Sequence, residues 1–215
     1  MKKFQTNLLV SLMAPAIIST AIISSAITTV DAGDGLIINQ TNISGNALSD
    51  SRGIIGVNMA AGDENAQVNA RAIVIGEGVP VLSDLNIQQR IHNKLTLGSP
   101  SYNLDYIGGD AFAGSAGIIS INQTAGSGTA QANLVSIGIG GGNAVQASQA
   151  SMEQLLMSYG KVEGSLEGYE GKRSDIIDGN AFSGSHGLVV VNQSAGSANR
   201  VFNTVAIQFK VIEIP

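Results

Sequence analysis

The side chains that could support catalysis or bind a metal ion are few and scattered. His92 and His186 have no other potential ligands beside them, although a metal site needs several donors at close spacing. Asp175, Asp178 and Asn180 offer oxygen ligands for calcium, but the regular spacing of a calcium loop is absent. These residues therefore predict no metal site.

Glycine, serine and cysteine also give no catalytic pattern. The glycines at residues 140–142 are not followed by a lysine and a helical segment, so they do not indicate a phosphate-binding loop. No serine lies in a nucleophile elbow. The chain has no cysteine, which excludes thiolate zinc sites and cysteine nucleophiles. We expect no cofactor and a protein that is not an enzyme.

Amide side chains, in contrast, recur at equivalent positions in three similar segments. An amide carries both a donor and an acceptor, so identical amides that are stacked one strand spacing apart can form a continuous ladder of hydrogen bonds. If the residues were merely exposed, their recurrence in all three segments would be unexplained. We therefore predict assembly ladders formed by Asn58, Asn122 and Asn192, by Asn69, Asn133 and Asn203, and by Gln123 and Gln193.

The three segments are copies of one unit of 31 residues, at residues 45–75, 109–139 and 179–209. Repeats of this length indicate one supersecondary unit that has been duplicated so that the copies stack on one another. The copies share glycine, asparagine, alanine and aliphatic residues. This pattern indicates a structural or assembly protein.

Each unit is expected to form a strand, a turn and a second strand. The first strands are predicted at residues 54–58, 118–122 and 188–192, and the second at 69–75, 133–139 and 203–209. Repeat turns are predicted at Gly62, Gly126 and Gly196, because glycine adopts backbone angles that other residues avoid. A further short extended piece is expected at residues 47–48, 111–112 and 181–182.

Aliphatic residues alternate along both strands of the unit, and residues two apart share a face of a strand. In the second strand the asparagine lies on the same face as the aliphatic residues. An unpaired amide there costs about 1–3 kcal/mol, and stacking removes that cost. The predicted stacking core consists of Ile55, Val57, Ile119, Ile121, Val189, Val191, Ile73, Ile137 and Ile207.

The remaining segments divide the chain around the units. Residues 1–32 have the pattern of a signal peptide that is cleaved after Ala32, and an uncleaved membrane anchor is the alternative. Residues 33–44 form a lead-in with a partial repeat at 35–42. Residues 76–108 and 140–178 are two irregular linkers, with a short helix expected within 143–160, and residues 210–215 form a tail.

Composition and charge restrict the partners. Without residues 1–32, which include two lysines and one aspartate, the chain has 9 basic and 15 acidic residues and a formal charge of −6. Nucleic-acid binding usually shows a basic stripe, so we expect no nucleic-acid partner. Aromatic residues make up only 4%, which suits flat, closely stacked strands.

The predicted fold is all-β: a three-repeat β-solenoid-like or cross-β stack with one layer per repeat. A closed β-sandwich of paired repeats is the alternative. If the layers follow chain order, the third copy of one subunit meets the first copy of the next. Arg200 would then lie near Asp63 and Glu64 of that neighbour and form an inter-subunit pair.

The segment GVNMAAGDENAQVN at residues 56–69 resembles the repeat motif of the Fap functional amyloids, and residues 120–133 and 190–203 match it in register. The resemblance implies a subunit that is secreted to the extracellular space or surface of a bacterium and polymerises into biofilm fibrils. It implies self-association, a related major subunit and outer-membrane export machinery as partners, with no small-molecule substrate. The family's major subunit ends in a paired-cysteine motif, so this chain is nearer the minor, nucleator-like subunit.

Two other functions remain open from the sequence. One is a monomeric β-solenoid adhesin or a donor-strand pilin, since residues 207–214 alternate as a donated strand would. The other is a β-helix polysaccharide lyase, which needs clustered acids and bases that the repeats lack.

Overall fold

The computed structural model describes residues 26–30, 37–76, 81–83, 85–93, 101–141, 145–147, 151–158 and 171–211. Within these ranges the regular structure is entirely β-strand. The same ranges hold no helix that is long and apolar enough to cross a membrane. The predicted all-β class is confirmed.

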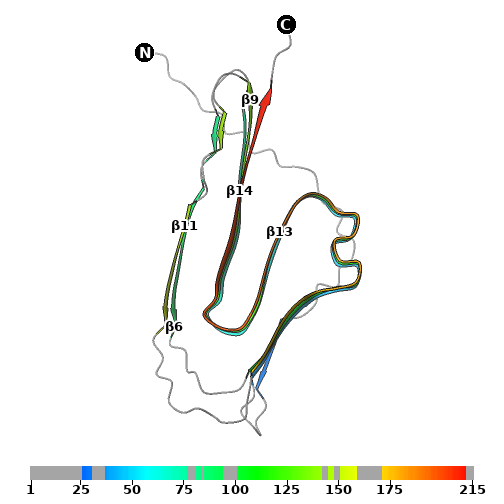
Figure 1. The fold of residues 1–215 in the computed structure, drawn as a ribbon, viewed down its shortest axis with the longest axis vertical. Helices are drawn as coiled ribbons and strands as arrows, with labels where there is room; N and C mark the ends of the chain where they lie inside the picture. The colour runs from blue at the N-terminus through cyan, green and yellow to red at the C-terminus, as the bar shows by residue number, and fades with distance from the viewer. Residues whose placement is uncertain are drawn as a thin grey trace.

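Three strands make up each of three flat layers, which we call rungs. Figure 1 looks along the stack, and the three rungs follow the same path. The first rung contains β2 (Ile37–Ile43), β3 (Arg52–Ala61) and β4 (Ala66–Gly76). The second contains β7 (Ser101–Ile107), β8 (Ala116–Ala125) and β9 (Ala130–Gly141). The third contains β12 (Lys172–Ile177), β13 (His186–Ala195) and β14 (Arg200–Val211).

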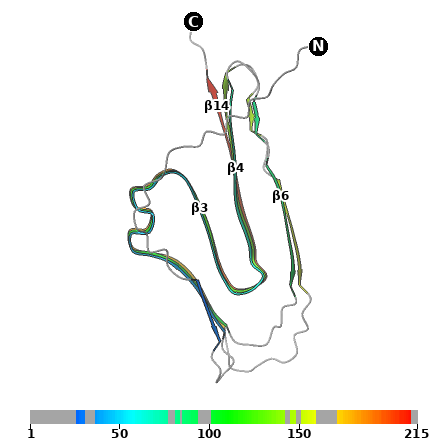
Figure 2. The same ribbon diagram turned by 180° about the vertical axis from the view of Figure 1, so that it is seen from behind.

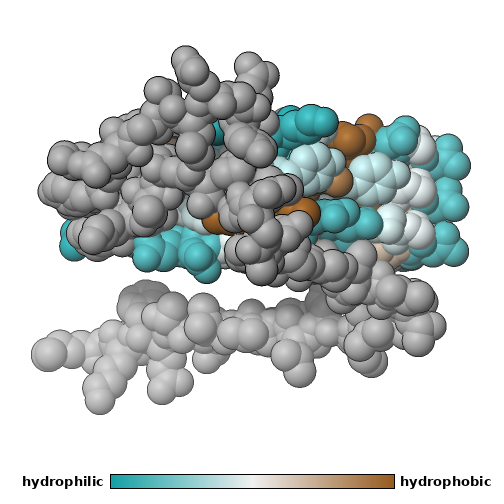
Figure 3. All heavy atoms as spheres, turned by 90° about the horizontal axis from the view of Figure 1, so that it is seen from below, coloured by the Kyte–Doolittle hydropathy of each residue, from teal (hydrophilic) through white to brown (hydrophobic). Residues whose placement is uncertain are grey.

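Equivalent strands of successive rungs pair in parallel and in register. Asn122 of β8, for example, pairs with Asn58 on one side and with Asn192 on the other. In each of the three sheets that the rungs form, the second-rung strand lies between its first- and third-rung equivalents, in the orders β2-β7-β12, β3-β8-β13 and β4-β9-β14. Viewed from below, like colours recur in successive layers of the visible described residues (Figure 3). The predicted stack with one layer per repeat is confirmed.

Each rung begins earlier in the sequence than the 31-residue unit. β2 lies in the predicted lead-in, whereas β7 and β12 lie in the last residues of the two predicted linkers. The three strands pair in register, so that Thr41, Asp105 and Asp175 form one column. The described part of the predicted partial repeat, residues 37–42, therefore pairs with β7 rather than with the central strand that its sequence resembles.

The short extended piece predicted at residues 47–48, 111–112 and 181–182 is wrong. These residues lie in a compact turn, where Leu48, Phe112 and Phe182 have φ angles of 57°, 61° and 63°. The turns also stack: the Phe112 and Phe182 rings are parallel, with centroids 5.0 Å apart. The apolar side chains point into the core from a left-handed backbone conformation, which a strand-like sequence pattern does not reveal.

The linkers are not wholly irregular, and the helix predicted within residues 143–160 is wrong. β10 (Val145–Ala147) pairs in parallel with β5 (Val81–Ser83), and β11 (Ser151–Ser158) pairs in parallel with β6 (Asn86–Asn93). Because both linkers connect one rung to the next, their backbones are held one rung apart, and strand pairing prevails over a weak helical pattern.

One strand departs from this parallel arrangement. β1 (Ala26–Val30) pairs with β2 in antiparallel orientation, from Ala26 opposite Thr41 to Val30 opposite Ile37. It lies on the outer side of the first rung and precedes the predicted cleavage point after Ala32. Among the strand pairs that the structure describes, this one alone is antiparallel.

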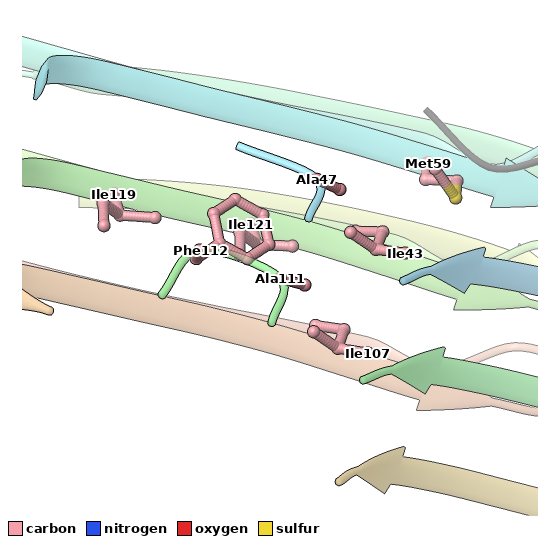
Figure 4. Close-up of a cluster of buried hydrophobic side chains, with 8 residues drawn as sticks. All are labelled: Ile43, Ala47, Met59, Ile107, Ala111, Phe112, Ile119 and Ile121. Carbon is pink, nitrogen blue, oxygen red and sulfur yellow. The ribbon is translucent and has the colours of Figure 1, made fainter. Parts of the chain in front are cut away.

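The hydrophobic interior lies in two places. The larger cluster fills the space between the first strands, the turns and the central strands, as Figure 4 shows, and consists of Ile43, Ala47, Met59, Ile107, Ala111, Phe112, Ile119 and Ile121. A smaller cluster joins Ala132 and Leu134 of β9 to Leu85 and Ile87 of the first linker. Figure 2 shows β6 running beside β4. The space between the central and last strands is occupied differently, by amides.

Candidate assembly site

A polar interior lies between the β3-β8-β13 sheet and the β4-β9-β14 sheet. Asn122 of β8 and Asn133 of β9 point into it, and both side chains are fully buried. Side chains alternate along a strand, so Ile119 and Ile121 point the opposite way, into the hydrophobic cluster. The alternation in the sequence thus directs Asn122 to one side of β8 and Ile119 and Ile121 to the other.

The asparagines form two columns along the stack. In the first, Asn122 Nδ2 donates to Asn58 Oδ1 and Asn192 Nδ2 donates to Asn122 Oδ1, both at 3.0 Å. In the second column, Asn133 Nδ2 donates to Asn69 Oδ1 and Asn203 Nδ2 donates to Asn133 Oδ1, both at 3.1 Å. Both asparagines of the middle rung are therefore bonded to the rungs on both sides.

The two columns are also bonded to each other within each rung, which the sequence did not indicate. Asn133 Nδ2 donates to Asn122 Oδ1 at 3.0 Å, and the corresponding distances in the first and third rungs are 2.8 and 2.6 Å. Asn133 Nδ2 also donates to the Ile121 carbonyl at 2.9 Å, and Asn122 Nδ2 donates to the Val68 carbonyl at 2.8 Å. The six asparagines form one connected network.

Glutamine columns lie on both sides of the central strands. Gln193 Nε2 donates to Gln123 Oε1 at 3.0 Å, and Gln123 Nε2 donates to the Tyr106 carbonyl at 3.1 Å, on the side that faces β7. Another pair, Gln67 and Gln131, was not predicted, and Gln67 Nε2 donates to Gln131 Oε1 at 2.8 Å. The fixed offset between equivalent residues of the repeats would have identified this pair.

The predicted stacking core divides between two locations. Ile119 and Ile121 are fully buried in the larger cluster, and Ile55, Val57 and Val191 pack against it. Val189 stands in the Ile119 column and is 37% exposed on the third rung. The column of Ile73, Ile137 and Ile207 lies farther along the last strands, where Ile73 is 42% exposed and the other two are partly buried.

The three repeat-turn glycines have positive φ angles and stack directly on one another. The φ angles of Gly62, Gly126 and Gly196 are 99°, 140° and 123°. A Cβ atom on Gly62 would lie 2.2 Å from the Gly126 carbonyl oxygen, and one on Gly126 would lie 1.9 Å from the Gly196 carbonyl oxygen. Glycine is therefore required at Gly62 and Gly126 for two reasons, backbone conformation and close approach of the next rung.

A buried carboxyl group in the first strands was not identified from the sequence. Asp105 is fully buried and stands in register between Thr41 and Asp175. Its Oδ1 accepts the Thr41 hydroxyl, and its Oδ2 accepts the Ala125 and Ser194 backbone N–H groups, each at 3.1 Å. Burial, together with the nearby Asp175 carboxylate, raises the pKa of Asp105 to about 7 against the lowering effect of its hydrogen bonds.

This raised pKa predicts that Asp105 makes folding stability depend on pH. The folded chain holds the Asp105 proton more tightly than the unfolded chain. The stability that protonated Asp105 contributes is therefore fully present below about pH 4 and is lost as the pH rises through about 7. Asp105→Asn keeps a neutral group that can accept both N–H groups and donate to Thr41. Relative to Asp105→Asn, the unchanged chain should lose about 4 kcal/mol between about pH 4 and pH 8.

The measurement is urea unfolding of both chains across this pH range. Asp110→Asn serves as the control, since Asp110 is exposed in the turn that follows β7. If the Asp105→Asn chain and the unchanged chain follow parallel stability curves, the carboxyl group is not held protonated by burial.

The other candidates considered from the sequence do not come together in a site. His186 is exposed, Asp178 accepts the Gly179 N–H, and Asn180 donates to Asp110. The described residues contain no group of three or more histidine or acidic side chains that could hold a metal ion. The structure describes the backbone of His92 in β6 but not its side chain.

The charged residues of the predicted inter-subunit pair lie at opposite ends of the stack. Asp63 and Glu64 are exposed in the turn before β4, on the first rung. Arg200 is exposed at the start of β14, on the third rung, in register with Ala130 and Ala66. The structure does not bring the pair together within one chain, but it places them at the same corner of the two end rungs.

The sequence matches the model of the functional amyloid protein FapB/FapC family over residues 20–210. This span includes all three rungs up to the last residues of β14. No solved structure matches the chain.

Proposed function

The chain belongs to the functional amyloid protein FapB/FapC family, and from that premise we propose that it is a secreted subunit that joins head to tail into bacterial biofilm fibrils. Membership of this family gives the chain the general role of a functional amyloid, which is structural rather than catalytic. Extracellular location, surface adhesion, outer-membrane export and a related major subunit are parts of the proposal, which rest on the family resemblance.

The observations that carry the proposal are the exposed amide of the first rung and the open strand edges at both ends of the stack. Asn122 in the middle rung is fully buried, whereas the equivalent Asn58 is exposed on the first rung. The outer edges of β3 and β4 at one end, and of β13 and β14 at the other, have no neighbouring strand among the described residues. Open edges of this kind favour pairing with another chain.

A head-to-tail joint would continue every column of the stack. If the third rung of one copy meets the first rung of a second, Asn192 lies beside the second copy's Asn58, and Asn203 beside its Asn69. In these two asparagine columns the donors already run in one direction, from the third rung toward the first. Asn58 Nδ2 of the second copy would therefore face Asn192 Oδ1, and the joint would repeat the contacts within one chain.

The proposal is tested by diluting residues 33–215 from denaturant and recording fibre diffraction. Reflections near about 4.7 Å and about 10 Å, with acceleration by preformed fibrils, are the expected result. A folded monomer that gives no fibres would instead support the monomeric adhesin. That alternative is favoured by the asparagine network, which is already complete within one chain. Deleting residues 211–215 separates a donor-strand fibre, which should fail, from a ladder-driven stack.

The corner charges provide a separate prediction about the joint. Arg200→Glu places a negative charge beside Asp63 and Glu64 of the next subunit, so seeded growth should slow about two- to fivefold, as expected for an exposed ion pair. Adding Asp63→Lys and Glu64→Lys to the same chain should restore growth. Lys172→Glu is the matched control, because Lys172 is an exposed cation of the same rung. The other residues in the column of Lys172, Tyr102 and Ile38, carry no acidic group. Failure of the triple variant to recover would remove this pair from the joint.

A further inference from the structure

The outer edge of β2 is already occupied, unlike the outer edges of the other first-rung strands. β1 lies along it in antiparallel register over five residue pairs, and the sheet order is β1-β2-β7-β12. β1 therefore stands on the side of β2 that faces away from β7. Figure 1 shows it as the blue arrow beside the first strands of the rungs.

This edge is the place that a second subunit needs. In the proposed joint, β12 of another copy would pair with β2, just as β7 pairs with β2 on its other side. The outward N–H and C=O groups of a strand edge can pair with one neighbouring strand at a time. Pairing with β1 and pairing with the β12 of a second copy therefore exclude each other.

We propose that residues 26–30 are a removable cap on the first-rung end of the stack. While the chain is uncut, β1 covers the edge of β2 and delays docking of a second subunit there. Cleavage after Ala32 removes the strand and opens the edge. The inference rests on the proposed function, because it assumes that subunits join third rung to first rung.

The cap has the advantage of being in the same chain as its target. Six residues separate Val30 from Ile37, and a short connection gives a high effective concentration at the edge, which a dilute second subunit does not match. The cap covers β2 and also approaches β3. Since the strands of a rung lie at one level, a strand on β2 keeps the whole third rung of a second copy from seating.

The third-rung end has no such cover among the described residues. β12, β13 and β14 all stand at the outer side of their sheets. A capped chain can therefore add through its third rung to the first-rung end of a growing fibril, and its own capped first rung then stops growth at that end. It cannot add at the other end of the fibril, because there its first rung would have to dock.

The experiment compares seeded growth of three purified chains on fibrils of residues 33–215. These are the full chain, residues 33–215, and the full chain with Ile27→Pro and Thr28→Pro. Adjacent prolines remove a backbone donor from each side of β1 and so disrupt its pairing. We expect the full chain to elongate about tenfold more slowly than residues 33–215, and the proline variant to recover most of the rate.

The second readout is inhibition. A small fraction of full chain added to residues 33–215 should stop growth at one end of each fibril, seen by imaging single fibrils, and the proline variant should not. If the proline variant is as slow as the unchanged full chain, or if the full chain grows as fast as residues 33–215, the cap is refuted while the proposed function stands. If residues 33–215 themselves do not elongate, the proposed function fails, and the cap fails with it.

Discussion

Gly126→Ala is expected to disrupt the stack, whereas Gly53→Ala leaves the folded chain intact. Both glycines have positive φ angles, 140° and 107°, so both substitutions carry backbone strain of about 1–3 kcal/mol. They differ in space: the new Cβ would lie 1.9 Å from the Gly196 carbonyl oxygen in one case and would have no atom within 4 Å in the other. Gly126→Ala should therefore lose more than about 4 kcal/mol of folding free energy.

Thermal and urea unfolding followed by circular dichroism would measure the two substitutions. Equal losses of folding free energy for both variants would mean that backbone conformation alone, and not the approach of the next rung, requires glycine at these positions.

Gly53→Ala also separates folding from assembly. A Cβ on Gly117 meets the Gly53 carbonyl at 2.0 Å, and a Cβ on Gly187 meets the Gly117 carbonyl at 2.2 Å. The Cβ of Ala at 53 would meet Gly187 of a second copy and block the proposed joint.

Asn122→Ala is the other substitution with a large expected effect. The Asn122 side chain donates to Asn58 and to the Val68 carbonyl, and accepts from Asn133 and Asn192. Its loss leaves several buried partners unpaired, each at about 1–3 kcal/mol, so we expect a total loss of about 3–5 kcal/mol. Asn58→Ala, at the exposed end of the same column, should cost about 1 kcal/mol in the folded monomer.

Urea unfolding of both variants checks this difference between the middle and the end of the column. If Asn122→Ala and Asn58→Ala cost the same, the amides do not act as a buried network. In the fibre the difference should nearly vanish, because Asn58 is itself covered there. Fibrils of either variant should then dissolve at a similarly lowered denaturant concentration.

The layered arrangement and the amide columns could be predicted because identical residues recur at the same position of each repeat. Asn122 follows Asn58 by 64 residues and precedes Asn192 by 70, and the hydrogen bonds obey the same offsets. In a parallel in-register stack, residues at the same position of successive copies lie next to one another. This is why simple comparison of the copies was informative about long-range contacts.

Columns of unlike residues could not be found in this way. Thr41 shares a column with Asp105 and Asp175 but not their carboxyl side chain, so comparison of the copies did not align β2 with β7 and β12. Contacts between neighbouring strands of one rung could also not be predicted by comparing the copies. Arg71 interrupts a valine column, and the structure shows that Gly56 opposite it leaves room for the guanidinium, which donates to the Ile55 carbonyl at 2.7 Å.

The paired strands of the two linkers form a layer that is only two strands high, whereas the stack beside it has three rungs. β6 and β11 pair in a two-stranded sheet, and Leu85 and Ile87 of the first linker cover Ala132 and Leu134 of the neighbouring three-stranded sheet. At the level of the third rung Phe202, in the same column as Ala132, is 59% exposed. Head-to-tail growth would repeat this uncovered level once in every three rungs. The fibre flank would then carry a notch one strand high, with an axial period of about 14 Å superimposed on the strand spacing.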